Sequence, residues 1–398
     1  MILSDVCEFI VDCPHSTAPD EGEGYPLIRT PNVGKGRLDL NGVHRVSESV
    51  YKQRIQRGAP RANDLIFARE APAGNVALVQ ENQTVCLGQR TVLIRPNVQK
   101  VNPQYLVYYL LSPKPQYELL GTANGATVAH VNLPAIRNLK IELPEKSVQD
   151  KIGTILVTYD DLIENNQRQI KLLEEAAQRL YKEWFVDLRF PGHENTKIVD
   201  GVPEGWRVAS IADICDTVGG GTPSTKIQSY YEKGDILWVT PTDITRNFSL
   251  ALLDTEKKIT PEGLKNSSAK MLPAETILMT SRASVGFFGM CKYEVCTNQG
   301  FISCIPKREN LQMYLLFNLK SRVEEIRQKA GGSTYLEISK TVFRELKIIL
   351  PKDEVLAEYQ KNVHDIFDEI YCRTEMIKSL VDMRNRLLPK LMSGEVEV

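Results

Sequence analysis

Long helical stripes and short strand-like runs alternate along the chain, and this alternation occurs twice. In residues 147–187 and 352–392, apolar side chains recur at spacings of three and four, which predicts one long helix in each stretch. The stripe of the first helix consists of Val148, Ile152, Ile155, Tyr159, Leu162, Ile170, Leu173, Ala177, Leu180 and Trp184. The stripe of the second consists of Val355, Tyr359, Val363, Ile366, Ile370, Ile377, Leu380, Leu387 and Leu391.

Neither predicted helix can bury its apolar stripe alone, so we expect the two helices to pair with each other. The pairing has to be antiparallel if the globular parts of the chain lie at opposite ends of the helices. The alternative is that each helix packs only on its own globular part.

The rest of the chain contains short β-rich runs, which in the first half are 65–68, 76–79, 92–95 and 139–143. In the last run, apolar and charged residues alternate, which predicts a half-buried strand. An amphipathic helix over 104–111 interrupts the runs, with Asn102 as its N-cap and Pro103 in its first turn. The sequence therefore predicts mixed α/β globular parts.

The second half of the chain repeats the order of the first about 210 positions later. Asp64 and Gly74 correspond to Thr276 and Gly286, with apolar residues at matching places between them. The clearest block is Gly-x-Thr followed by Leu-x-Ile-x-Leu-Pro. It comprises Gly125, Thr127, Leu139, Ile141, Leu143 and Pro144 in the first half, and Gly332, Thr334, Leu346, Ile348, Leu350 and Pro351 in the second.

We therefore predict a mixed α/β fold with two similar globular domains and two long antiparallel coiled-coil helices in a pseudo-symmetric repeat. The predicted boundaries are 1–146 for the first globular domain, 147–187 for the central helix, 188–200 for a linker, 201–351 for the second globular domain, 352–392 for the C-terminal helix and 393–398 for a tail.

Composition excludes several classes of protein. No run is long and apolar enough for a membrane span, and the first residues lack the pattern of a secretory signal, so we expect a cytoplasmic protein. The eight cysteines are scattered without a C-x-x-C pair, and there are only five histidines, so we expect no metal site.

The net charge of −1 argues at first against nucleic-acid binding. The acidic excess, however, falls in the helical segments, while the globular domains are slightly basic and residues 45–69 form a basic stretch. Phosphate binding depends on such local patches rather than on the charge of the whole chain. A solvated basic surface remains the alternative for this stretch.

No motif in the sequence predicts catalysis. Asn102–Tyr105 is similar to the Asn-Pro-Pro-Tyr of amino-methyltransferases, but Gln104 replaces the second proline and helix capping accounts for the segment. The glycine-rich stretch 219–226 lacks the Gly-Lys-Ser/Thr of a P-loop. His15 and His130 stand alone in polar loops, where a hydrogen-bonding surface role is the simpler interpretation.

Polar side chains of the types that read DNA bases lie between the strands. Arginine pairs with guanine, and asparagine or glutamine with adenine, through two parallel hydrogen bonds. The two halves differ at nearly all of these positions while keeping the apolar pattern, which suits two domains that read different half-sites. For each residue, a phosphate contact or a structural role is the alternative. The candidates are Arg29, Thr30, Asn32, Arg69, Gln89, Arg90, Asn124 and Thr127, and, in the second half, Thr222, Ser224, Thr240, Thr242, Arg246, Arg282, Gln299 and Thr334.

This arrangement resembles the specificity subunit of type I restriction-modification systems, over essentially the whole chain. The single motifs are weak, but their doubled order is specific. The resemblance is carried by Asp64-Leu65-Ile66 with Gly74, its copy Thr276-Ile277-Leu278 with Gly286, the two Leu-x-Ile-x-Leu-Pro strands, the helix endings at 180–185 and 387–394, and the segment Gly201-Val202-Pro203-Glu204-Gly205-Trp206.

The resemblance implies a non-catalytic subunit that recognises an asymmetric, two-part target in double-stranded DNA through two target-recognition domains. Two methylation subunits would bind S-adenosylmethionine and methylate adenine. Restriction subunits would use ATP and Mg²⁺ for translocation and cleavage. This chain would hold no cofactor of its own.

Two other functions stay open on the sequence alone. One is a self-contained methyltransferase or nuclease, which S-adenosylmethionine or metal binding by the isolated chain would favour. The other is a coiled-coil scaffold whose globular ends bind proteins. It predicts no sequence-selective DNA binding even when partners are present.

Overall fold

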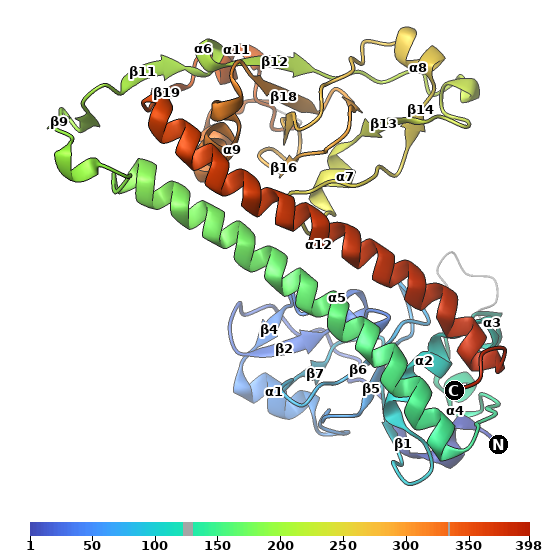
Figure 1. Ribbon diagram of the computed structural model, residues 1–398. Helices are drawn as coiled ribbons and strands as arrows, with labels where there is room; N and C mark the ends of the chain where they lie inside the picture. Colours follow the sequence, from blue (N-terminus) through green and yellow to red (C-terminus); the bar gives the residue numbers. More distant parts are fainter. Residues whose placement is uncertain (122–129, 333–334) are drawn as a thin grey trace. The chain divides into compact units, whose positions relative to one another are not determined.

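The computed structural model describes residues 1–121, 130–332 and 335–398. The chain forms two compact units, Met1–Glu164 with Ser379–Val398, and Asn165–Lys378. The division falls inside both long helices, α5 (Lys146–Tyr181) and α12 (Asp353–Ser393), which Figure 1 shows in green and red. Each unit therefore consists of a globular part and a segment of each long helix.

A five-stranded sheet forms the centre of the first unit. Its strand order is β1-β8-β5-β6-β3, in which the first four strands run antiparallel to their neighbours and β3 runs parallel to β6. Strand β5 is buried along its whole length, because both faces of the sheet are covered by apolar side chains. The strands are β1 (Cys7–Asp12), β3 (Gly36–Arg37), β5 (Leu65–Ala68), β6 (Val76–Leu78) and β8 (Thr91–Pro96).

A smaller sheet and four helices complete the globular part of the first unit. In the small sheet, β2 lies between β4 and β7, antiparallel to the former and parallel to the latter. These elements are β2 (Tyr25–Ile28), β4 (Arg45–Val46), β7 (Cys86–Leu87), α1 (Glu48–Arg54), α2 (Pro103–Leu111), α3 (Pro113–Gly121) and α4 (Leu133–Arg137).

Helix α2 connects the sheet of the first unit to the long helices. As the sequence predicts, Asn102 is its N-cap, and the Asn102 side chain accepts a hydrogen bond from the Tyr105 amide at 3.0 Å. The helix is buried on nearly all sides rather than amphipathic, because it lies between the sheet and α5. Gly153 of α5 permits the close approach, since a Cβ there would lie 3.0 Å from the Tyr105 nitrogen.

The second unit contains a four-stranded antiparallel sheet in the order β12-β18-β15-β16. A three-stranded sheet, β14-β13-β17, lies beside it, with β13 parallel to β17 and antiparallel to β14. The strands are β12 (Cys215–Gly219), β13 (Ile236–Val239), β14 (Lys258–Ile259), β15 (Ile277–Thr280), β16 (Phe288–Gly289), β17 (Cys296–Thr297) and β18 (Phe301–Pro306).

Two short ribbons and several helices belong to the same unit. The ribbons pair β9 with β10 and β11 with β19, both antiparallel. These elements are β9 (Ile198–Val199), β10 (Val202–Pro203), β11 (Arg207–Ser210), β19 (Lys347–Leu350), α6 (Ile211–Ile214), α7 (Pro241–Thr245), α8 (Pro261–Lys265), α9 (Gln312–Ser321), α10 (Val323–Gln328) and α11 (Lys340–Arg344).

The structure confirms the mixed α/β fold, the two long helices and the predicted strands at β5, β6 and β8. The predicted strand at 139–143 is wrong. This segment makes one isolated bridge, between Ile2 and Lys140, because only the first residues of the chain lie opposite it. The corresponding segment of the second half does form a strand, β19, which pairs with the four residues of β11.

The buried face of α5 also differs from the predicted stripe. Leu162 is 43% exposed, whereas the polar residues Gln149, Asp160 and Asn166 are buried. The predicted stripe includes only apolar side chains and therefore lies slightly off the buried face. After Tyr181, α5 continues as one π-helical turn (Lys182–Val186). No helix in the described part of the chain is long and apolar enough to cross a membrane.

Candidate nucleic-acid interface

Predicted DNA-binding residues of the first unit gather at the turn that follows β5. The Arg69 guanidinium donates to the Val131 carbonyl and to Nε2 of His130, both at 2.8 Å. Because arginine has no acceptor, this ring nitrogen must accept, and Nδ1 of His130 therefore carries the proton. That Nδ1 donates to a carboxylate oxygen of Glu70 at 2.5 Å.

Glu70 joins this network to a second predicted residue, Arg90. The Arg90 guanidinium lies 2.8 Å from the other carboxylate oxygen of Glu70, and its side chain is 63% exposed while that of Glu70 is 16% exposed. The carboxylate thus holds one exposed guanidinium and one imidazole in place. Arg69 and Arg90 were predicted from the sequence as DNA-binding residues, whereas Glu70 was not predicted.

The loop after β2 uses its polar residues differently. The Asn32 side chain is buried, where it accepts from the Arg29 amide at 3.1 Å and donates to the Asp39 carbonyl at 3.2 Å. Thr30 is 9% exposed. The Arg29 side chain packs against Gly88, and its Nε atom is buried without a hydrogen-bond partner in the described part of the chain. Asn32 and Thr30 thus shape the loop from inside.

Two glutamines at corresponding places tie loops together. In the first unit, Gln89 donates to the His15 carbonyl at 2.9 Å, across to the loop that follows β1. In the second unit, the Thr222 hydroxyl, which lies after β12, donates to the exposed Gln299 side chain. Each glutamine keeps some of its hydrogen-bonding capacity for another partner. Ser224 lies exposed two residues after Thr222.

The predicted residues of the second unit lie in two further places. Arg282, in the turn after β15, is 46% exposed, and its Nε lies 3.6 Å from a carboxylate oxygen of Glu337. Thr240 is the N-cap of α7, where the Asp243 carboxylate accepts from the Thr240 amide at 2.8 Å and from the Thr240 hydroxyl at 2.6 Å. Glu337 was not predicted from the sequence.

Thr242 and Arg246 line a cavity of about 330 Å³ beside α7, together with Asp243, Asn247, Phe248, Lys378 and others. Both residues are exposed. Among the described residues, the Arg246 guanidinium makes no hydrogen bond or ion pair, so it can contact a phosphate or a base. Asn124, Thr127 and Thr334 lie outside the described residues.

The basic stretch 45–69 is largely paired within the protein. Arg54 is 5% exposed and donates to backbone carbonyls, among them that of Leu87 at 3.5 Å. Arg57 lies 2.5 Å from Asp12, and Arg61 lies 3.2 Å from Glu8. Arg54 therefore holds the fold together, and only the exposed members of this stretch can contribute to a phosphate-binding surface.

Comparison with known proteins identifies the family. The model of the type I restriction modification DNA specificity domain matches residues 1–175 and, a second time, residues 203–381. This chain belongs to that family. It is 24% identical over 404 residues to the HindI specificity subunit of Haemophilus influenzae, covering 85% of this chain and 87% of the relative. It is 28% identical over 373 residues to the MjaIX specificity subunit of Methanocaldococcus jannaschii, covering 90% and 83%.

A solved structure agrees at the level of the fold. The S subunit of a type I restriction-modification system from M. genitalium matches with a TM-score of 0.58 and 16% identity, covering 98% of this chain and 95% of that one. The chain is therefore a type I specificity subunit, and its function is to recognise DNA for a restriction-modification system.

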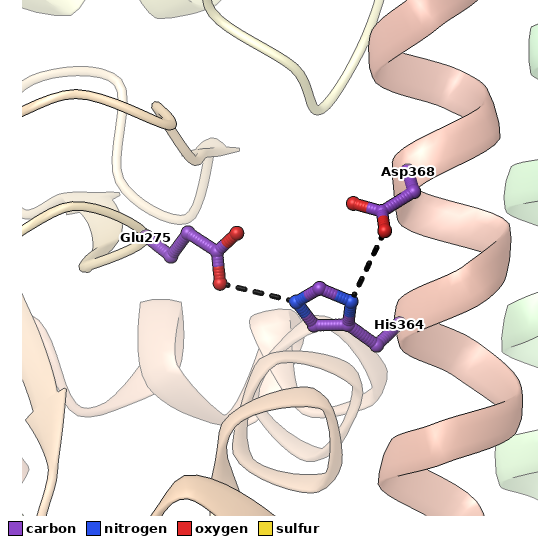
Figure 2. Close-up of side chains that lie close together, drawn as sticks. All are labelled: Glu275, His364 and Asp368. Atoms are coloured by element: carbon purple, nitrogen blue, oxygen red, sulfur yellow. Dashed lines mark hydrogen bonds and ion pairs between the residues drawn. The ribbon is translucent and has the colours of Figure 1, made fainter.

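One cluster in the second unit of this specificity subunit brings a histidine and two carboxylates within 4.8 Å of one another (Figure 2). His364 and Asp368 lie on α12, and Glu275 lies just before β15. Nε2 of His364 is 3.2 Å from Glu275, and Nδ1 is 3.5 Å from Asp368, so the ring lies between the carboxylates. Asp368 also pairs with Lys292 at 2.6 Å. The His364 ring and the two carboxylates thus connect α12 to the loop before β15.

Two buried cysteines of the specificity subunit, Cys86 and Cys296, have unreactive thiols. Burial raises the pKa of the Cys86 thiol to about 11 and that of Cys296 to about 12. Such thiols stay protonated at neutral pH, whereas nucleophiles and metal ligands must be thiolates. Cys86 and Cys296 therefore serve as small apolar core residues.

Proposed function

We propose that this subunit reads an asymmetric, two-part DNA target, with one half-site for each globular domain and the long helices as the spacer. The chain itself carries no catalytic residue and binds no cofactor. Methylation subunits supply S-adenosylmethionine and adenine methylation, and restriction subunits supply ATP- and Mg²⁺-dependent cleavage. The proposed recognition domains are 1–146 and 201–351, with the linker 188–200 and the tail 393–398 outside them.

The observation that carries this proposal is the double match of the family model, to residues 1–175 and 203–381. The sheets support it. In the first unit the order β1-β8-β5-β6 has the same antiparallel pairings as β12-β18-β15-β16 in the second. In each unit a parallel pair, β2 with β7 or β13 with β17, accompanies the sheet. Two similar domains with different polar side chains suit two different half-sites.

The contacts inside each unit support an antiparallel helix pair. In the first unit, Asp160 of α5 pairs with Arg384 of α12. In the second unit, Asn166 accepts from Arg373 at 3.2 Å, and the ring of Tyr181 lies 6.4 Å from that of Tyr359. Residue numbers on α12 fall as those on α5 rise. A helix pair of this kind is stiff enough to set a distance between two DNA contacts.

Mapping DNA methylation tests the proposal. The chain is co-expressed with a cognate methylation subunit, and N6-methyladenine is mapped across the host genome. We expect one bipartite motif that is absent without this chain. Replacing residues 1–146 by the corresponding domain of another specificity subunit should change one half of the motif and leave the other half and the spacer intact.

Three results would contradict this proposal. A swap that alters both halves, or neither, would show that the domains do not read separate half-sites. Methylation by the chain without a methylation subunit would show a catalytic site of its own. A stable complex with no new methylation and no sequence-selective DNA binding would favour a scaffold.

A further inference from the structure

We propose that one corner of each unit makes the two domains read different bases. We define the corner as Glu70, Arg90 and His130 in the first unit, and as Arg282 and Glu337 in the second. This inference rests on the proposed function, which it deepens by naming side chains that determine specificity. It is carried by a shared backbone on which the carboxylate and the nitrogen group that faces it are placed in opposite order.

The backbone around the corner is the same in both units. Gly74 and Gly286 end the turn after β5 or β15 with φ angles of 89° and 87°, a conformation that favours glycine. Three amide-to-carbonyl hydrogen bonds recur within 0.1 Å, and together they fix the turn, the following strand and the adjacent loop. They are Val131 to Arg69 (3.0 Å) and Ile338 to Ser281 (3.1 Å), Arg69 to Arg90 (2.9 Å) and Ser281 to Gly300 (2.8 Å), and Gly74 to Ala68 and Gly286 to Thr280 (both 2.9 Å).

Glu70 and Arg282 directly follow Arg69 and Ser281 in the turn, and they carry opposite charges. In the first unit, the turn supplies the carboxylate of Glu70 and the neighbouring segment supplies the imidazole of His130, whose Nδ1 lies 2.5 Å from a carboxylate oxygen. In the second unit, the turn supplies the guanidinium of Arg282 and the neighbouring segment supplies the carboxylate of Glu337, with 3.6 Å between Nε and a carboxylate oxygen. Because His130 directly precedes Val131 and Glu337 directly precedes Ile338, the two pairs occupy matching places on the shared backbone.

The third position of the corner differs as well. The Arg90 carbonyl of the first unit accepts from the Arg69 amide of the shared backbone, and the Arg90 guanidinium lies 2.8 Å from Glu70. Its counterpart in the second unit is Gly300, which has no side chain. The first unit therefore presents an arginine from the loop, held by a carboxylate of the turn. The second presents an arginine from the turn beside an exposed carboxylate.

Base reading accounts for these differences better than phosphate binding or stability. A phosphate-binding site would not place a carboxylate in the corner of both units. Exposed ion pairs contribute little to stability, and Arg282 and Glu337 are 46% and 49% exposed, so the fold of the second unit does not require this pair. An arginine donates to guanine and a carboxylate accepts from the amino group of cytosine. Reversing their order changes the bases that fit.

An exchange of the corner tests this inference with the full chain in complex with its methylation subunit. Glu70→Arg combined with His130→Glu installs the order of the second unit in the first. We expect the methylation motif to change in at least one position of one half-site, with the other half-site and the spacer unchanged. Arg282→Glu combined with Glu337→His should change only the other half. The matched control is Lys114→Glu with Glu142→Lys, which reverses an exposed pair elsewhere in the first unit and should leave the motif unchanged.

Wild-type and variant motifs together separate the two proposals. If the wild-type chain directs no bipartite motif, the proposed function fails. If it does, and both exchanges leave the motif and its occupancy unchanged, the corner does not determine specificity and only this inference is overturned. If an exchange abolishes methylation, its motif cannot be determined, and the inference is then tested with the single variant Glu70→Gln. This variant keeps an acceptor but loses the charge, and we expect at least a tenfold loss of discrimination at a position of one half-site. Wild-type discrimination would overturn the inference.

Discussion

The two units hold the long helices by different chemistry. In the first unit the contact is ionic: Asp160 of α5 is 2% exposed, and its carboxylate accepts from Arg384 of α12 and, at 2.6 Å, from the Tyr108 hydroxyl of α2. In the second unit the contact is aromatic. The ring of Phe185 lies 4.7 Å from that of Tyr314 and 4.8 Å from that of Tyr359.

This difference determines how each unit responds to the substitution of one contact residue. A buried ion pair is sensitive to the loss of one partner, because the other charge is then left unpaired in a poorly hydrated place. When one ring of an aromatic cluster is removed, only the contacts of that ring are lost and those among the other rings remain. We infer that Asp160 fixes the register of the two helix segments in the first unit. In the second unit, the burial of apolar surface holds the helix segments in place.

The largest effect is expected from Arg384→Ala. It leaves the buried carboxylate of Asp160 without its counter-ion, which should destabilise the first unit by about 3–5 kcal/mol. All three tryptophans, Trp184, Trp206 and Trp238, belong to the second unit. Urea unfolding followed by circular dichroism should therefore begin at lower urea, while tryptophan fluorescence follows the second unit.

Two variants serve as controls for this prediction. Asp160→Leu combined with Arg384→Met removes both charges and should recover most of the lost stability, because a buried pair can be replaced by apolar side chains at little cost. Arg308→Ala, in the second unit, removes an exposed guanidinium that pairs with Asp353 at the start of α12 and should cost less than about 1 kcal/mol. A loss below about 1 kcal/mol for Arg384→Ala would show that the ion pair does not hold the first unit together.

A smaller and equal effect is expected where the two units use the same device. The Gln149 side chain accepts from the Asn102 amide at 3.0 Å, and the Gln360 side chain accepts from the Met313 amide at 2.9 Å. Each glutamine of a long helix thus satisfies a backbone amide at the start of α2 or α9. Gln149→Ala and Gln360→Ala should each cost about 1–3 kcal/mol, since each leaves that amide unsatisfied.

Comparing the two glutamine variants sharpens the contrast between the units. The loss should appear in circular dichroism alone for Gln149→Ala and in tryptophan fluorescence for Gln360→Ala. Equal losses would show that both units share one way of attaching their first core helix. A loss for one variant only would mean that the attachment, like the helix contact, differs between the units.

The fold could be predicted from the sequence where apolar patterns determine it. The strands β5, β6 and β8 and the two long helices follow from runs and stripes of apolar residues. Asp160 could not be predicted as a helix contact, because its partners Arg384 and Tyr108 are distant in the sequence and a buried charge contradicts the apolar pattern. The strand predicted at 139–143 failed because its extent depends on the segment that lies opposite, which periodicity does not reveal.

The candidate interface was predictable by residue type but not by role. Arg90 and Arg282 lie at the corner and Arg69 lies beside it, and all three side chains have defined partners. Asn32 has the same amide group that reads adenine, yet both of its hydrogen bonds go to its own loop. Side-chain chemistry alone cannot separate these cases, since they differ in burial. Whether any of these residues contacts DNA stays a prediction.

The smallest effect is expected from alkaline pH on the aromatic cluster of the second unit. Burial raises the pKa of Tyr359, Tyr314 and Tyr181 above the usual value near 10. These phenols stay protonated in the folded unit, whereas those of the unfolded chain ionise near pH 10. Their contribution to stability is therefore complete below pH 10 and is lost as the pH rises further.

Tyr359→Phe removes one such group together with only a long hydrogen bond, of 3.5 Å, to the Ala177 carbonyl. We expect a change below about 1 kcal/mol at pH 7 and a shift of alkaline unfolding, followed by tryptophan fluorescence in moderate urea, to higher pH. Tyr117→Phe, at a side chain 82% exposed in the first unit, should change neither. Alkaline unfolding at the wild-type pH in Tyr359→Phe would show that ionisation within the cluster does not limit the second unit.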